Sequence, residues 1–225
     1  MIAAALSFNS GILLFADADR PRSVAPRESR RIFQRQYGEP PHCARSVFVA
    51  SDIVGWTAAA FERSETALEA LPAASRTIDG MKDAIEHALF EAYQDQIGLP
   101  TAEQEFSAFI ALYSPIEKRY ALFHTLNTAL REVAGHDCVG PAAFLGHYLI
   151  RDPYNAARSM DALNLETVFS IATDTLDGVR ACNEKCGVSS EMAVMYADGH
   201  VSDIQRIPHD SHKERKVALA ALART

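Results

Sequence analysis

Long hydrophobic runs are missing from this sequence. No apolar stretch approaches the roughly 20 residues that a helix needs to cross a bilayer, and the first residues lack the basic-then-apolar pattern of a secretion leader. Cysteine is also scarce, at 4 of 225 residues. Without a leader, disulfides are not expected. These absences predict a cytoplasmic protein with free thiols and no membrane partner.

Motifs for cofactors and metals are absent too. The chain has no Walker loop, no Rossmann fingerprint, no H-E-x-x-H and no EF-hand loop. Cys182 and Cys186 can share one face of a helix, but no histidine lies near enough to complete a zinc-finger spacing. We therefore expect no cofactor and no metal. The net charge of -7 disfavours nucleic acid as a constitutive partner.

The composition is that of an ordinary globular chain. Hydrophobic residues make up 48% and charged residues 23%, which is enough for a sizeable core. We find no internal repeat, no low-complexity stretch and no break in composition. The chain is therefore expected to form a single domain over residues 1–225, with residues 211–225 as a C-terminal helical tail.

The clearest local signal lies at the amino terminus. Two apolar stretches, Met1–Phe8 and Ile12–Ala16, flank the turn residues Asn9–Gly11, a pattern that is typical of a β-hairpin. The second stretch ends on a carboxylate, Asp17. The chain is thus expected to open with two paired strands.

The remaining pattern alternates between strands and pairs of helices. Strands are expected at 31–36, 46–50, 106–113, 119–124, 128–133, 192–196 and 201–206. Helices are expected from Asp52 to about Leu71, from Thr77 to about residue 97, from Gly140-Pro141 to Asp152-Pro153, from Ser159 to about Cys182, and over 211–224. This order favours an α+β fold built in layers.

The ordered set of segments resembles the proteasome-type N-terminal-nucleophile hydrolases over nearly the whole chain. The resemblance is carried by the opening hairpin, by Arg31-Ile-Phe-Gln34, by Val49–Gly55, by Val139-Gly140-Pro141, and by Glu191-Met-Ala-Val with the Asp198-Gly199 turn. It implies a four-layer αββα sandwich, with two antiparallel sheets between helix pairs. Within that family, the chain resembles a bacterial proteasome-like subunit.

The resemblance also implies a set of site residues. In that family the first residue is both nucleophile and base, a lysine paired with an acid sets the local potential, and a turn amide receives the oxyanion. The matching positions here are Met1, Asp17, Arg31 and Ser51. Met1 has no hydroxyl or thiol and is not competent as a nucleophile. Arg31 stands in place of the lysine and cannot take up a proton, although it can pair with Asp17.

Three functions are compatible with this pattern. The first is a proteasome-like subunit that self-associates into a ring or chamber and lacks the N-terminal threonine nucleophile. The alternative is an active amide hydrolase or peptidase with a processed or non-standard terminus, which acts on a peptide or protein. The third is a small-molecule binding module between the sheets. The arginine-rich segment 20–35 is either a solvated loop or a contact between subunits of a homo-oligomer.

Simpler structural roles are open for the same residues. Asp17 and Arg31 can form a buried ion pair that only holds two strands.

Cys138 lies beside His136 and Asp137, which suggests a thiol nucleophile. However, neighbours on a strand point to opposite faces, so this base is not expected to be directed at the thiol.

Overall fold

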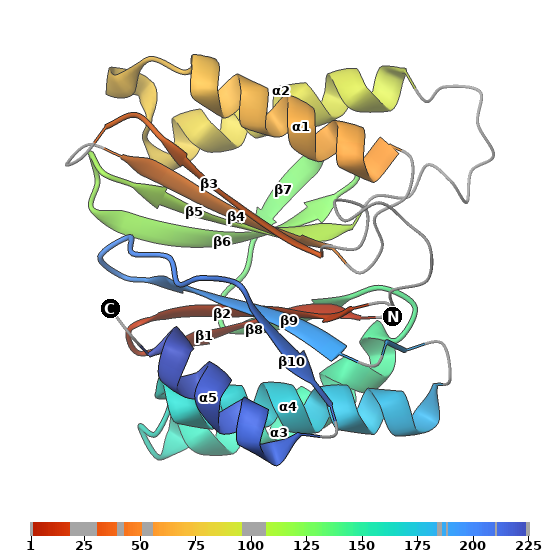
Figure 1. The fold of residues 1–225 in the computed structure, drawn as a ribbon. Helices are drawn as coiled ribbons and strands as arrows, with labels where there is room; N and C mark the ends of the chain where they lie inside the picture. Colours follow the sequence, from red (N-terminus) through yellow and green to blue (C-terminus); the bar gives the residue numbers. More distant parts are fainter. Residues whose placement is uncertain are drawn as a thin grey trace.

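Two antiparallel five-stranded sheets lie face to face, with helices on their outer faces (Figure 1). The computed structural model describes residues 2–18, 31–39, 43–50, 56–95, 107–183, 186–187, 189–209 and 211–223. The predicted α+β class with two antiparallel sheets is therefore confirmed. No helix in these ranges is long and apolar enough to span a membrane.

The first sheet, sheet A, contains the opening hairpin. Its strands, in spatial order, are β10 (Gln205–Pro208), β9 (Ser189–Tyr196), β2 (Gly11–Ala18), β1 (Ala3–Phe8) and β8 (His136–Val139). The helices α3 (Ala143–Ser159), α4 (Leu165–Cys182) and α5 (His212–Leu222) cover its outer face (Figure 1).

The second sheet, sheet B, is built from the middle of the chain. Its strands, in spatial order, are β3 (Ile32–Tyr37), β4 (Ala44–Ala50), β5 (Ala108–Ser114), β6 (Arg119–Leu126) and β7 (Ala129–Glu132). The helices α1 (Trp56–Ala70) and α2 (Ile78–Gln94) lie outside it, joined by the short 3₁₀ helix η1 (Ala73–Ser75).

The apolar residues form three layers, and β2 shows why. All eight of its residues are buried, because sheet B covers one face and helices cover the other. Ile12 and Leu14 belong to the cluster between the sheets, whereas Leu13 and Phe15 belong to the cluster under the helices. A strand buried on both faces has a continuous apolar sequence, as this one does.

Two helix boundaries differ from those predicted. The third helix was expected to stop at Asp152-Pro153, but α3 continues through Pro153 to Ser159. Proline in a helix interior costs about 3 kcal/mol, and burial of Tyr154 and Ala157 against the core offsets that cost. Ser159 therefore ends α3 and does not cap the next helix, whose N-cap is Asn164.

The strand β8 is the main element that the sequence pattern missed. It has only four residues, three of them ionisable, and it pairs with β1 in antiparallel register, with Ala3 opposite Val139. The last strand also lies later in the chain than the predicted strand at 201–206. The strand β10 begins at Gln205, and Val201 makes only an isolated bridge to Met195.

Candidate functional site

Asp17 lies near the end of β2 and is buried, with 2% of its surface exposed. Its Oδ1 accepts the backbone N–H of Ile2 at 2.5 Å, and its Oδ2 accepts the N–H of Gly187 at 3.2 Å. A buried carboxylate is tolerated when such donors replace its water shell. Asp17 thus holds Ile2, just before β1, and Gly187, just before β9, against the same carboxylate.

A second buried carboxylate, Glu191, connects the two sheets. It lies on β9 opposite Ala16, whose side chain faces sheet B. Its Oε2 accepts the N–H of Arg31 at 2.7 Å and that of Ile32 at 3.2 Å, and the residue is only 3% exposed. The first residues of β3 are therefore held by a side chain from the opposite sheet.

Glu191 is not among the site residues predicted from the sequence, where the Glu191-Met-Ala-Val run indicated only a strand. A usable signal existed, because a glutamate followed by four apolar residues in a buried stretch of strand must find donors inside the protein. The pattern could not show that the donors come from β3, which is 160 residues away in the chain.

Two of the four predicted site residues lie in the described part of the chain. Asp17 is opposite Ser190 on β9, and the backbone of Arg31 is bound by the adjacent Glu191. Both predicted residues are buried, at 2% and 1% exposure. The fold therefore brings Asp17 and Arg31 to the same end of β9, while a salt bridge between them stays a prediction.

The other two predicted positions, Met1 and Ser51, lie outside the described residues. Their roles as the nucleophile position and as the oxyanion amide stay predictions.

The structure gives no support to the thiol nucleophile considered for Cys138. The side chain is 3% exposed, and burial raises the pKa of the thiol far above its ordinary value. The His136 ring packs on Tyr154, with ring centroids 4.7 Å apart. The Asp137 carboxylate accepts the N–H of Cys138 and does not bind its sulfur. Strand alternation thus places Asp137 on the face of β8 opposite Cys138, while His136, on the same face as Cys138, contacts Tyr154.

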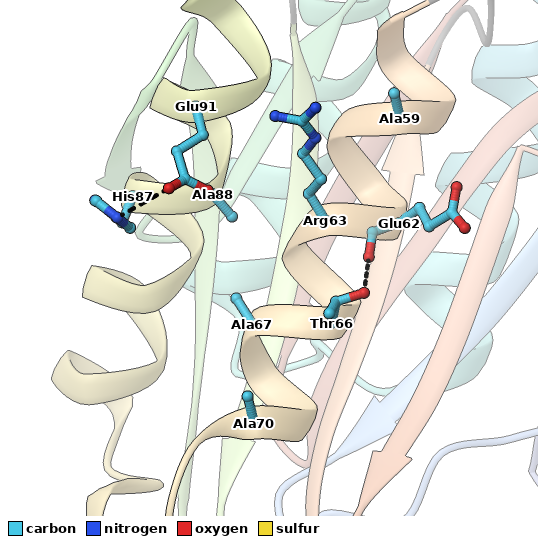
Figure 2. Close-up of a pocket in the computed structure, with 9 residues that line it drawn as sticks. All are labelled: Ala59, Glu62, Arg63, Thr66, Ala67, Ala70, His87, Ala88 and Glu91. Carbon is cyan, nitrogen blue, oxygen red and sulfur yellow. Dashed lines mark hydrogen bonds and ion pairs between the residues drawn. The ribbon is translucent and has the colours of Figure 1, made fainter.

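A groove lies between α1 and α2 on the outside of sheet B (Figure 2). Its volume is about 600 Å³. On the α2 side, His87 Nε2 lies 3.3 Å from Glu91 Oε1. The groove is lined by Ala59, Glu62, Arg63, Thr66, Ala67, Ala70, His87, Ala88 and Glu91. It belongs to a different layer from Asp17 and Glu191, so it is not part of the buried-carboxylate site.

This layered arrangement is similar to that of several solved Anbu structures. Anbu from Hyphomicrobium sp. strain MC1, solved as a Gly-1 mutant, has a TM-score of 0.72 at 13% identity, covering 97% of this chain and 93% of its own. Anbu, the ancestral β-subunit, from Yersinia bercovieri gives 0.70 at 12%, covering 96% and 91%. Anbu from Pseudomonas aeruginosa, solved as a helical assembly, gives 0.72 at 12%, covering 99% and 94%.

No protein-family model matches the sequence, and no curated protein matches it. At 12–13% identity, the likeness to the Anbu structures shows the fold alone. It also corrects the family predicted from the sequence. The assignment to the proteasome-type N-terminal-nucleophile hydrolases is wrong, because these structural neighbours are Anbu proteins, a proteasome-like branch distinct from those hydrolases.

Proposed function

We propose that this chain is a proteasome-like subunit that associates with copies of itself into a ring or chamber. The observation that carries the proposal is the likeness in fold to Anbu proteins over 96–99% of the chain, one of which is solved as a helical assembly. The proposed unit is a single domain over residues 1–225 with a helical tail at 211–225. Its role is to build a scaffold or enclosed chamber, without an N-terminal threonine nucleophile.

The surface of α3 supports this proposal. Phe144 and Tyr148 lie one turn apart on this helix and are 89% and 63% exposed. The opposite face of α3, which carries Gly146 and Ile150, is buried against sheet A. Large aromatic side chains side by side on a surface are typical of protein–protein contacts. We therefore propose that a second copy of this chain covers Phe144 and Tyr148.

The predicted site residues have a structural role within this proposal. We propose that Asp17 and Arg31 set the charge at the amino-terminal end of β1, with Met1 at the nucleophile position and the Ser51 amide at the oxyanion position. In a subunit without that nucleophile, their function is to hold the ends of the strands. The hydrogen bonds of Asp17 to Ile2 and Gly187 support this role.

Size-exclusion chromatography with light scattering tests the proposal on the full chain at micromolar concentration. The wild-type protein is expected to elute with the mass of several copies, and a Phe144→Ser/Tyr148→Ser variant with a lower mass. The matched control is Phe90→Ser, because Phe90 is also exposed, at 49%, but lies on α2 in the other helix layer. A monomeric wild-type protein would overturn the proposal. A double variant with unchanged mass would exclude the α3 contact.

A further inference from the structure

Three side chains other than those of Asp17 and Glu191 meet between the two sheets. Ser107 directly precedes β5, His124 lies on β6, and Asp137 lies on β8 of the opposite sheet. The Ser107 Oγ is 3.0 Å from His124 Nε2, and His124 Nδ1 is 2.9 Å from Asp137 Oδ2. The three groups therefore form a continuous serine–histidine–aspartate chain of hydrogen bonds.

Strand register explains why these residues face one another. Phe109 is opposite His124 and belongs to the apolar layer between the sheets, so Ser107, two positions earlier, is on the same face. Val139 also belongs to that layer, which places Asp137 on the same face of β8. The backbone thus directs all three side chains into the space between the sheets.

The hydrogen bonds fix the proton on the imidazole. An ionised carboxylate can only accept, so the bond to Asp137 places the His124 proton on Nδ1. The Nε2 lone pair then accepts the Ser107 hydroxyl proton, as a general base does before a serine attacks a carbonyl. Both distances lie within the range of about 2.6–3.2 Å that such a transfer requires.

The carboxylate of Asp137 is held in place by other groups. Its Oδ1 accepts the N–H of Cys138 at 2.9 Å and lies 3.2 Å from His147 Nε2, while Arg131 donates to Oδ2 at 3.1 Å. Burial tends to raise the pKa of Asp137, but the bonds from His124 and Cys138 outweigh it and hold the pKa below its ordinary value. Asp137 is therefore ionised at neutral pH, as a partner of the histidine must be.

A purely structural role explains Asp137 but does not explain Ser107. The carboxylate joins sheet A to β6 and β7 through His124 and Arg131, and this contact needs no serine. Ser107 is half-buried and the His124 side chain is 12% exposed, so both lie at the boundary with solvent. The His124 ring packs against Phe109, 5.1 Å between centroids, which limits its rotation.

We propose that Ser107 is a nucleophile that reacts with small carboxylic esters, with His124 as its base and Asp137 as a positioning residue. The Ser107 oxygen bonds to the ester carbonyl carbon, and its proton passes to His124 Nε2. The bond from that carbon to the alcohol oxygen then breaks, and the alcohol leaves with the proton from His124. Water, activated by the same nitrogen, hydrolyses the acyl-serine and releases the acid. This site is independent of residue 1 and of the proposed self-association.

The test uses the full wild-type chain and a fluorophosphonate probe, followed by intact mass measurement and peptide mapping. We expect one adduct, on Ser107, and slow hydrolysis of p-nitrophenyl acetate. Ser107→Ala is expected to lose both signals. The control Ser10→Ala removes an exposed turn hydroxyl and is expected to leave both unchanged. His124→Gln is expected to slow labelling about 100-fold or more, because a general base contributes roughly 10²–10⁴-fold.

Two further measurements separate activation from structure. A Ser107→Cys variant is expected to react with iodoacetamide faster than the exposed Cys182, and His124→Gln in that background is expected to remove the difference. Asp137→Asn is expected to remove a downfield proton resonance of His124 Nδ1–H, which Ser107→Ala retains. An adduct on another residue, no adduct on folded wild-type protein, or equal labelling of the folded His124→Gln variant would overturn the proposal.

Discussion

Replacing Glu191 tests whether one buried side chain holds the two sheets together. Glu191→Ala removes the acceptor for two backbone donors, the amides of Arg31 and Ile32, which lie 2.7 and 3.2 Å from Oε2. A buried donor left without a partner costs about 1–3 kcal/mol. Two such donors therefore predict a loss of about 2–6 kcal/mol in the free energy of unfolding. Domain stabilities are only about 5–15 kcal/mol, so the effect is large.

Glu191→Gln separates the hydrogen bonds from the charge. Its side-chain carbonyl oxygen can accept from the same two amides, so the loss should be smaller, about 1–2 kcal/mol, the difference between charged and neutral acceptors. Equilibrium urea unfolding measures both losses. Hydrogen exchange at the amides of Arg31 and Ile32 reports the local effect. Glu62→Ala, which removes an exposed glutamate on α1, is the control and should change stability by less than about 0.5 kcal/mol.

The reasoning would be refuted if Glu191→Ala unfolded at the same urea concentration as the wild-type protein. It would also be refuted if Glu191→Gln were as unstable as Glu191→Ala, since the loss would then come from the charge and not from the acceptor. Unchanged exchange at Ile32 in a destabilised Glu191→Ala variant would show that the contact between the sheets is not the cause.

Three further outcomes follow from packing and titration. Gly11→Ala should cost about 1–3 kcal/mol in urea unfolding, because its added Cβ would lie 2.3 Å from the carbonyl oxygen of Met195 on the paired strand. In a native thiol titration, Cys182 should react in the first phase and Cys138 only after unfolding, because the first is exposed and the second buried; equal rates would contradict the packing. Burial is the main cause that lowers the pKa of His209 below 6.5. The unfolded chain therefore binds that proton more readily, so stability should fall as pH drops below about 6.5; His209→Gln should reduce this fall, measured by urea unfolding at pH 7 and pH 5.

Patterns within one element could be predicted from the sequence. The opening hairpin with its turn before Gly11, the cap at Thr77 and the terminal helix after Ser211 all depend on neighbours in the chain, and each is present. The order of the elements was enough to predict a layered α+β fold, whereas the two antiparallel sheets were expected from the family resemblance. The stop at Pro153 was wrong because the burial of Tyr154 outweighs a local preference.

The sites depend on pairings across long stretches of chain. Asp17 was selected because the family resemblance places an acid at the end of the second apolar stretch, next to a local hairpin signal. Glu191 was not selected because its donors lie 160 residues earlier. Asp137 was considered only with its sequence neighbours, yet its partners are on β6, β7 and α3. The missing information was the alignment of the two sheets, which no local pattern contains.

The position of β2 in sheet A has a consequence for how the chain folds during synthesis. This strand is made long before one of its two partners, β9, which begins only at Ser189. Until β9 emerges from the ribosome, β2 has one open row of N–H and C=O groups beside apolar side chains, and such an edge attracts other chains. A nascent or truncated chain that ends before β9 should therefore depend on chaperones, and the segment from Ser189 onward protects the first hairpin from aggregation.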